Sequence, residues 1–378
     1  MGEHQRIPIW KNVSDELWSD WNWQISNTIE SLEQLENIIE LHENEKKGII
    51  ESGELFRMRI SPHIALIMKS GTHDDSLRKQ FIPSIMEVDS IDDSTLFDDV
   101  NADDRYSPLK GLTHRYPTKV LVFPSNFCGC YCRYCFRRKL KRESEELLSN
   151  DDFIEIVKYI KAHPEINEVI FSGGDPLVVS DSKIEYFLNS LADVETVKVI
   201  RFHTRMPITI PYRITDEFVS ILRKYNEYYS IYFVIHVDTK REISSQSIDA
   251  IKRLTDIGIL CFASCPLLYG INADEKVLSE LWMYLIENRI KPYYLFHSDP
   301  VKGLKHFLVP LSRGLDIMRN IYDNISGLAV PHYCLNVPDG GGHVLLAYPY
   351  VKEISDNEYE IVNFEGKITK YIETEDII

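Results

Sequence analysis

The hydrophobic pattern changes its period near residue 104. Before that point, apolar side chains recur every three or four residues over 18–39, as in a helix that buries one face, and Ser14 is placed to cap its start. A second apolar helix is expected over 63–69, followed by an acidic, turn-rich linker over 89–104. The first region of the chain is therefore predicted to be helical and separate from the rest.

After the linker, short apolar segments alternate with amphipathic ones. The short segments are rich in β-branched and aromatic residues, which favour strands. They span 119–123, 168–171, 197–202, 231–236, 259–264 and 292–296. Helical patterns between them include 153–160, 218–225 and 277–286. Such repeats imply parallel strands with right-handed crossovers, so we predict an α/β fold, a partial (β/α)6 TIM-like barrel with an N-terminal helical extension. The expected domains are a helical region with its linker (1–104), the barrel (105–345) and a C-terminal extension (346–378).

The predicted barrel would bring several polar segments to one rim, because chemistry in such folds collects at the carboxyl ends of the strands. A cysteine-rich loop follows the first predicted strand, and Ser172 to Asp175 follow the second. His236 ends the fourth strand and Asp299 follows the sixth. We therefore expect these residues to surround one site.

The cysteine-rich loop has four cysteines within eight residues: Cys128, Cys130, Cys132 and Cys135. The first, third and fourth have the spacing Cys-x3-Cys-x2-Cys, which suits three irons of a 4Fe-4S cluster and leaves the fourth iron open to a small molecule. A structural zinc site would need four ligands, usually in two separated pairs, and disulfides belong to secreted proteins. A cluster is the favoured interpretation, with Cys130 as either a neutral filler or a thiol close to the iron.

Composition narrows the functional classes. The chain of 378 residues has 42 basic and 58 acidic side chains, a formal charge of −16, which disfavours general binding to nucleic acid or anionic lipid. The basic run 133–142 is therefore interpreted as anion-binding arginines that face the site, and not as a nucleic-acid patch. No apolar stretch approaches the ~18 residues of a membrane span, and residues 1–10 form no apolar signal segment, so a cytoplasmic enzyme is expected.

The segment Ser172-Gly173-Gly174-Asp175 has two adjacent glycines on the predicted rim. Without a Cβ atom the backbone can approach a ligand closely, and the two amides would be placed to meet the amino and carboxylate ends of S-adenosylmethionine. Alone, the segment would be an ordinary turn. Beside the cysteine loop, we interpret it as part of a cofactor site.

Three runs of sequence resemble one known family. They are Leu-Thr-His-Arg-Tyr-Pro-Thr-Lys-Val over 112–120, Cys-Arg-Tyr-Cys-Phe-Arg-Arg over 132–138, and Phe-Ser-Gly-Gly-Asp-Pro-Leu over 171–177. The chain resembles the lysine 2,3-aminomutase family of radical S-adenosylmethionine enzymes, and the likeness extends from the Trp-rich N-terminus to 363–367. The resemblance implies a cluster-bound S-adenosylmethionine that is cleaved reductively to a 5′-deoxyadenosyl radical, which takes a hydrogen atom from a free amino acid. It also implies an electron donor such as flavodoxin or ferredoxin, and a homo-oligomer.

The resemblance also assigns site residues. The iron ligands map to Cys128, Cys132 and Cys135. The arginine that pairs with the substrate carboxylate maps to Arg137, whose guanidinium suits a bidentate contact. Of the two acids that hold the distal ammonium in lysine-specific members, one is kept as Asp299 and the other has become Asn336. The residues expected to bind S-adenosylmethionine are Ser172, Gly173, Gly174, Asp175 and His236.

The largest departure from the family is at His343. In aminomutases this position is the lysine that forms a Schiff base with pyridoxal phosphate, and an imidazole cannot form that bond. Arg115 and Lys119 match the positions of phosphate-handling residues, so an anion could still bind there. We expect no pyridoxal phosphate, and without it the 1,2-shift of an amino group loses the imine through which it passes.

The expected reaction without that cofactor is inversion at the α-carbon. Returning a hydrogen atom to the opposite face needs a donor thiol. Cys334 is the expected donor because it lies two residues before Asn336, on the same face of an extended segment, and Cys265 is the second choice. The leading prediction is therefore a pyridoxal-independent amino acid epimerase. The alternatives are an amino acid 2,3-aminomutase that uses pyridoxal phosphate without a Schiff-base lysine, and a non-catalytic relative, which the joint survival of the motifs disfavours.

Overall fold

A nine-stranded sheet forms the centre of the protein, with its strands in the order of the chain. The computed structural model describes residues 2–53, 55–68, 72, 75–138, 145–355, 358–363 and 365–372. The strands that run parallel are β2 (Lys119–Ser125), β3 (Glu168–Gly173), β4 (Val199–Thr204), β5 (Ser230–His236), β6 (Leu260–Pro266), β7 (Ile290–Phe296) and β8 (His332–Val337). β1 (Leu112–Tyr116) and β9 (Gly342–Leu345) are antiparallel to their neighbours and form the two edges. The predicted α/β partial barrel is confirmed, and the structure adds β1, β8 and β9 to the six strands expected from the sequence.

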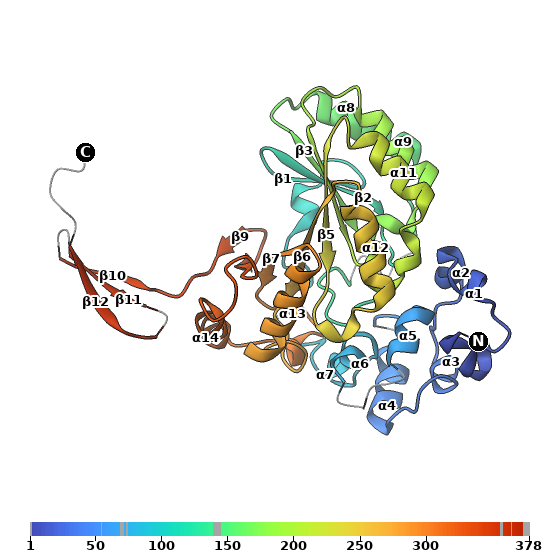
Figure 1. Ribbon diagram of the computed structural model, residues 1–378, viewed down its shortest axis with the longest axis horizontal. Coiled ribbons are helices and arrows are strands. Elements are labelled where there is room, and N and C mark those ends of the chain that lie inside the picture. The colour runs from blue at the N-terminus through green and yellow to red at the C-terminus, as the bar shows by residue number, and fades with distance from the viewer. Residues whose placement is uncertain are drawn as a thin grey trace.

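Helices cover the outer surface of the curved sheet (Figure 1). They are α8 (Asn150–Lys161), α9 (Asp181–Leu191), α11 (Asp216–Tyr225), α12 (Ser245–Thr255), α13 (Glu275–Glu287) and α14 (Leu311–Ile321), with the single-turn α10 (Met206–Thr209) after β4. α8 shows why such segments are helical, since the Ser149 side chain caps its start and its apolar residues fall on one buried face.

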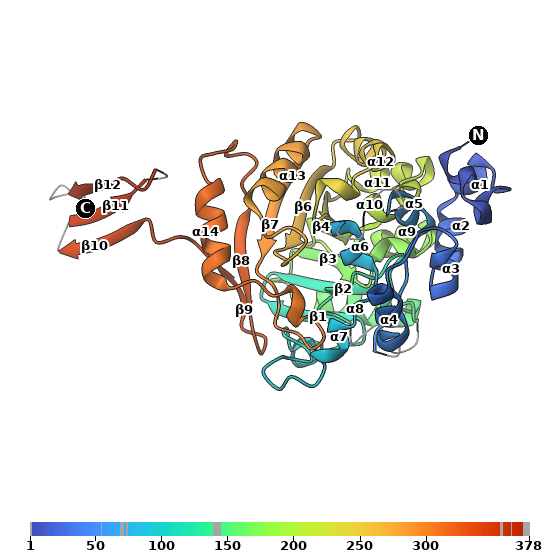
Figure 2. The same ribbon diagram turned by 90° about the horizontal axis from the view of Figure 1, so that it is seen from below.

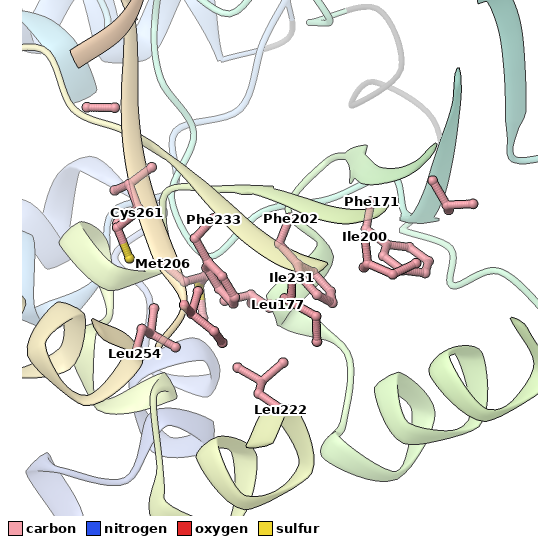
Figure 3. Packing of buried hydrophobic residues seen from close by; sticks show 14 of the residues in the cluster. Phe171, Leu177, Ile200, Phe202, Met206, Leu222, Ile231, Phe233, Leu254 and Cys261 are labelled. Atoms are coloured by element: carbon pink, nitrogen blue, oxygen red, sulfur yellow. The ribbon is translucent and has the colours of Figure 1, made fainter. Parts of the chain in front are cut away.

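The main hydrophobic core lies between the strands and these helices. The rings of Phe171, Phe202 and Phe233 stack across three neighbouring strands with centroids 5.2 Å apart, and Leu222 and Leu254 face them from α11 and α12 (Figure 3). Side chains alternate between the two faces of a strand. The residues next to each phenylalanine on its own strand therefore point into the barrel. The barrel interior is therefore available for polar side chains.

The N-terminal region is helical, as predicted, but it is divided into short helices. They are α1 (Asp15–Trp18), α2 (Trp21–Ser26), α3 (Leu32–Glu36), α4 (Glu43–Ser52), α5 (Pro62–Met68), α6 (Ser76–Phe81) and α7 (Met86–Asp89). The expected cap at Ser14 is present, with its hydroxyl accepting from the Leu17 amide at 3.1 Å. The expectation of continuous helix over 18–39 is wrong, because Asp20 and Ser31 each cap a new helix. α5 corresponds to the expected second helix up to residue 68, and residue 69 lies outside the described part.

The chain ends in a separate antiparallel sheet of β10 (Val351–Ser355), β11 (Glu358–Val362) and β12 (Ile368–Ile372). This sheet and the first helices, α1 to α3, lie at opposite ends of the molecule (Figure 2). The division into 1–104, 105–345 and 346–378 remains a proposal. Among the described residues, no helix has the length and apolar character needed to cross a membrane.

Candidate active site

The barrel contains a cavity of about 310 Å³ that extends from the start of β2 to the loops after the strands. Site residues predicted from the sequence that line it are Cys128, Cys132, Cys135, Arg137, Ser172, Gly173, Gly174, Asp175, His236, Asp299 and Asn336. The structure thus brings together residues that are more than 200 positions apart in the sequence. Cys334 is not among the residues that line the cavity, whereas Cys265 is.

The N-terminal helical region holds the cysteine loop in place. The amide of Arg133 donates to the Gln80 carbonyl at 2.8 Å. Its guanidinium, which is completely buried, pairs with Glu87 at 2.9 and 2.7 Å. Arg138 pairs with the same carboxylate. The interpretation of 133–142 as arginines that face the site is therefore wrong for Arg133 and Arg138, because a buried carboxylate attracts both. Arg137 lines the cavity, and residues 139–142 lie outside the described part.

The four cysteines of the loop have different environments. Cys130 is 4% exposed, and its sulfur accepts from the Ser61 amide at 3.1 Å. Burial raises the pKa of this thiol to about 11. Cys128, Cys132 and Cys135, called the ligand cysteines below, are more exposed than Cys130, although all four cysteines line the cavity. This arrangement supports the filler role for Cys130.

The ligand cysteines suit a cluster better than a single ion. In the described part of the chain, no three His, Cys, Asp or Glu side chains converge closely enough to hold one metal ion. Cluster ligands each bind a different iron and need not converge in this way. In addition, Nη1 of Arg205 donates to the sulfur of Cys132 at 2.7 Å, a contact that stabilises a thiolate. The donor set therefore fits a 4Fe-4S cluster.

Arg205 and Tyr134 connect the cysteine loop to the barrel, and sequence reasoning missed both. Nη1 of Arg205 is 2.5 Å from the hydroxyl of Tyr134, and its Nη2 pairs with Glu242 at 2.5 Å and Asp238 at 3.1 Å. Nε2 of His236 is 2.9 Å from the same hydroxyl. His236 is thus already hydrogen-bonded within the protein, and its contact with S-adenosylmethionine stays a prediction. Arg205 follows β4 on the predicted rim, so its position was the signal that could have identified it.

The turn after β3 is shaped by the cysteine loop itself. At Gly173, where φ is +101°, a Cβ atom would lie 2.7 Å from the Ser125 carbonyl, and at Gly174 it would collide with the Phe127 backbone. The Gly174 amide donates to the Ser125 carbonyl at 2.9 Å, so it is not placed to meet S-adenosylmethionine as expected. The glycines are needed because two loops pack backbone to backbone.

Asp175, at the end of this turn, is a positioning residue. Its carboxylate accepts from the Leu177 amide at 3.0 Å, from the Thr204 hydroxyl at 2.7 Å and from the Arg205 amide at 2.7 Å. These bonds join the loop after β3 to the end of β4. Asp175 therefore keeps Arg205 beside Cys132.

Two polar side chains face the cavity from neighbouring parts of the chain, Asn336 near the end of β8 and Asp299 in the loop after β7. Nδ2 of Asn336 donates to Asp299 at 3.0 Å, which leaves the buried Oδ1 of Asn336 without a partner in the described residues. Burial raises the pKa of Asp299 to about 6, although the Asn336 hydrogen bond and the charge of Arg137 both lower it. Arg137 is held by Asp103, with Nε and Oδ2 3.1 Å apart, and by the ring of Phe136, 4.9 Å away. Asp103 is a further lining residue that the sequence did not reveal.

Comparison with known proteins gives the family. Residues 122–281 match the model of the Radical SAM superfamily, and residues 318–378 match that of Lysine-2,3-aminomutase. The L-lysine 2,3-aminomutase of Fusobacterium nucleatum is 36% identical over 370 residues, which are 98% of this chain and 86% of that protein. The chain belongs to the lysine 2,3-aminomutase family. Another member, the glutamate 2,3-aminomutase of Clostridioides difficile, is 33% identical over 366 residues, 97% of this chain and 85% of that protein.

Membership of the lysine 2,3-aminomutase family confirms the resemblance seen in the sequence. The chain is a radical S-adenosylmethionine isomerase, and the family implies both S-adenosylmethionine and a 4Fe-4S cluster. The L-lysine 2,3-aminomutase of Bacillus subtilis is 35% identical over 376 residues, covering 99% of this chain and 78% of that protein. The comparisons therefore extend through both the barrel and the C-terminal region.

A cationic wall lies in the same cavity, at the positions where the sequence predicts phosphate-handling residues. Arg115, Lys119 and Arg201 line it together with the imidazoles of His203 and His343. Three buried nitrogens of this group, Nε of Arg115, Nε of Arg201 and Nε2 of His203, have no partner in the described part of the chain. Burial and the charges of Lys119, Arg115 and Arg201 lower the pKa of His343 to about 4. The cationic wall can bind a phosphate group. The side chain of His343, however, has no amine that could form a Schiff base.

Proposed function

We propose that the protein is a radical isomerase of a free amino acid that moves the amino group between carbons 2 and 3. One observation carries the proposal: a single cavity joins the ligand cysteines to Arg137 at one place and to the pair Asp299 and Asn336 at another. The comparisons favour this reaction over the α-epimerisation predicted from the sequence, because relatives at 33–36% identity over nearly the whole chain are named 2,3-aminomutases.

The proposed substrate is bound through its two charged ends. The guanidinium of Arg137, oriented by Asp103, presents its fork to the α-carboxylate. The ligand cysteines would hold the cluster, and S-adenosylmethionine bound there would supply the carbon radical that takes a hydrogen atom from the substrate. Pyridoxal phosphate, when bound, supplies a conjugated ring system through which the amino group can move. The role of the surrounding side chains is to hold the substrate and keep water away from the radical.

The substrate proposed is an amino acid with a basic side chain. Asp299 provides one carboxylate, and the unpaired Oδ1 of Asn336 provides a second acceptor beside it. An ammonium or guanidinium group can donate to both oxygens, whereas a substrate carboxylate would be repelled by Asp299. The single negative charge of Asp299 balances the positive charge of the substrate's side chain.

The setting of this reaction is also a proposal. Reductive cleavage needs an electron donor, for which we propose a flavodoxin or ferredoxin, and we propose a cytoplasmic location for the enzyme. The family resemblance supports a homo-oligomer.

A second function, α-carbon epimerisation, is favoured by one specific observation. Cys265 lines the cavity, and burial raises the pKa of its thiol well above the ordinary value, so the sulfur keeps its hydrogen atom near neutral pH. Cys334 and Cys265 are both 4% exposed, but Cys334 lies outside the cavity lining. If the enzyme epimerises its substrate, Cys265 is therefore a better placed donor than Cys334.

Product analysis tests the proposal. The iron-loaded, reduced enzyme is incubated with S-adenosylmethionine, pyridoxal phosphate and L-lysine or L-arginine, and products are resolved by position and chirality. We expect a β-amino acid from one basic substrate and the same product from the Cys265→Ser variant. Formation of a D-amino acid that is lost in Cys265→Ser would establish epimerisation instead, and 5′-deoxyadenosine without either product would contradict both functions.

A further inference from the structure

The cavity contains a lysine near the position where the family lysine is replaced. Lys119 is the first residue of β2 and lines the cavity, and among the described lining residues it is the only lysine. Its Nζ lies 4.6 Å from the centroid of the Tyr116 ring. The His343 ring lies 6.0 Å from the same ring, and the His343 amide donates to the Tyr116 hydroxyl at 3.0 Å. Lys119 and His343 are thus neighbours around one tyrosine.

Hydrogen-bond donors for an anion lie in the same part of the cavity. Arg201 pairs with Glu168 at 2.8 Å and Arg115 is 3.5 Å from Asp103, yet each keeps a buried Nε without a partner in the described part. β2 and β4 both flank β3, so Lys119 and Arg201 extend from nearby strands. A buried donor without an acceptor is costly, and a bound phosphate would accept from both arginines.

We propose that Lys119 forms an imine with the aldehyde of pyridoxal phosphate, taking over the role that His343 cannot perform. This inference rests on the proposed amino-group shift, which needs that cofactor. The neutral amine of Lys119 attacks the aldehyde carbon, a C=N bond replaces the C=O bond, and one water molecule leaves. No oxidant or reductant is consumed. Arg115 and Arg201 bind the phosphate, and Lys119 supplies the primary amine that His343 lacks.

The variant Lys119→Arg distinguishes imine formation from a purely electrostatic role for Lys119. Lys119→Arg keeps the positive charge for a phosphate but removes the primary amine. If Lys119 only attracts the phosphate, this variant retains the cofactor in the same form as the native protein. If Lys119 forms the imine, the variant loses the covalent bond while Arg115 and Arg201 still bind the phosphate.

Borohydride trapping distinguishes the two roles without measuring activity. The iron-loaded protein is mixed with pyridoxal phosphate, reduced with sodium borohydride, digested and examined by mass spectrometry. We expect a phosphopyridoxyl group on the peptide that contains Lys119, and its complete loss in Lys119→Arg. The matched control is Lys291→Arg, because Lys291 also lies near the start of a strand, β7, but donates to the Val330 carbonyl at 2.9 Å and does not line the cavity. This control should keep the label on Lys119.

The outcomes separate this inference from the proposed function. A label on another lysine, or no label in the native protein, would overturn the assignment of Lys119. If borohydride traps no phosphopyridoxyl group on Lys119 but the protein still makes a β-amino acid, the proposed amino-group shift stands and the proposed imine is refuted. If Lys119 is labelled but no β-amino acid forms from any basic substrate, the imine stands and the proposed function fails.

Discussion

Replacing Asp299 with Asn should weaken binding of a basic amino acid and remove its pH dependence. The substitution removes the negative charge but keeps the shape and the contact with Asn336, which is 3.0 Å long in the native protein. A hydrogen bond to a charged group contributes about 1.5–3 kcal/mol. A loss of about 2 kcal/mol corresponds to ~30-fold in affinity.

The raised pKa of Asp299 predicts the direction of the pH effect. Burial brings this pKa to about 6, so the carboxylate is present above that pH and is lost as the pH falls through it. Since a group with a pKa of about 6 is ~91% ionised at pH 7 and ~9% at pH 5, affinity for a basic substrate should fall about tenfold over that interval. In Asp299→Asn this fall should disappear.

The assay is the substrate concentration that gives half-maximal 5′-deoxyadenosine formation, measured between pH 5 and pH 8. Asp193→Asn, at an exposed site outside the cavity lining, is the control and should match the native profile. An Asp299→Asn enzyme with native affinity, or one that keeps the roughly tenfold fall, would refute the role of Asp299 at the substrate.

Three further predictions concern the other residues of the site. Replacing any ligand cysteine with Ala should abolish iron retention in an iron and sulfide assay, while Cys130→Ala should keep it; loss of iron in Cys130→Ala alone would show that the ligands are wrongly assigned. Arg137→Lys keeps the positive charge but not the planar fork, so the substrate concentration for half-maximal 5′-deoxyadenosine formation should rise ~10-fold while the cluster spectrum is unchanged. If that concentration is unchanged, Arg137 does not bind the substrate. Arg205→Lys breaks a buried network and should lower the free energy of unfolding by about 3 kcal/mol in urea denaturation of the apoprotein; native stability would contradict the role of Arg205.

The sequence predicted elements whose signals are local. The parallel strands are hydrophobic and β-branched, and Ser14 is followed by acidic residues that favour a helix start. β8 and β9 were missed because they mix polar and apolar residues and flank a turn rich in glycine over 338–342, and β9 has only four residues. Asp20 and Ser31 divide the N-terminal helix because a cap residue can restart a helix within a continuous apolar pattern.

The parts of the site that the sequence could not supply depend on long-range contacts. The partner of Arg133 is Glu87, 46 residues earlier, so a basic run gave no sign that its arginines point in different directions. The alternation Ile200-Arg201-Phe202-His203 is a signal that could have been used, because strands buried on both faces are otherwise apolar throughout. Arg201 and His203 mark the interior face of β4 and hence the cavity.

The central claim is most directly tested by the position from which hydrogen is removed. A shift of the amino group from carbon 2 to carbon 3 requires loss of a hydrogen atom from carbon 3, whereas epimerisation requires its loss from carbon 2. Lysine deuterated at carbon 3 and lysine deuterated at carbon 2 are each turned over with the reduced enzyme, S-adenosylmethionine and pyridoxal phosphate. The account predicts deuterium in 5′-deoxyadenosine from the carbon-3 label alone. Deuterium from the carbon-2 label would contradict it and would establish α-carbon chemistry.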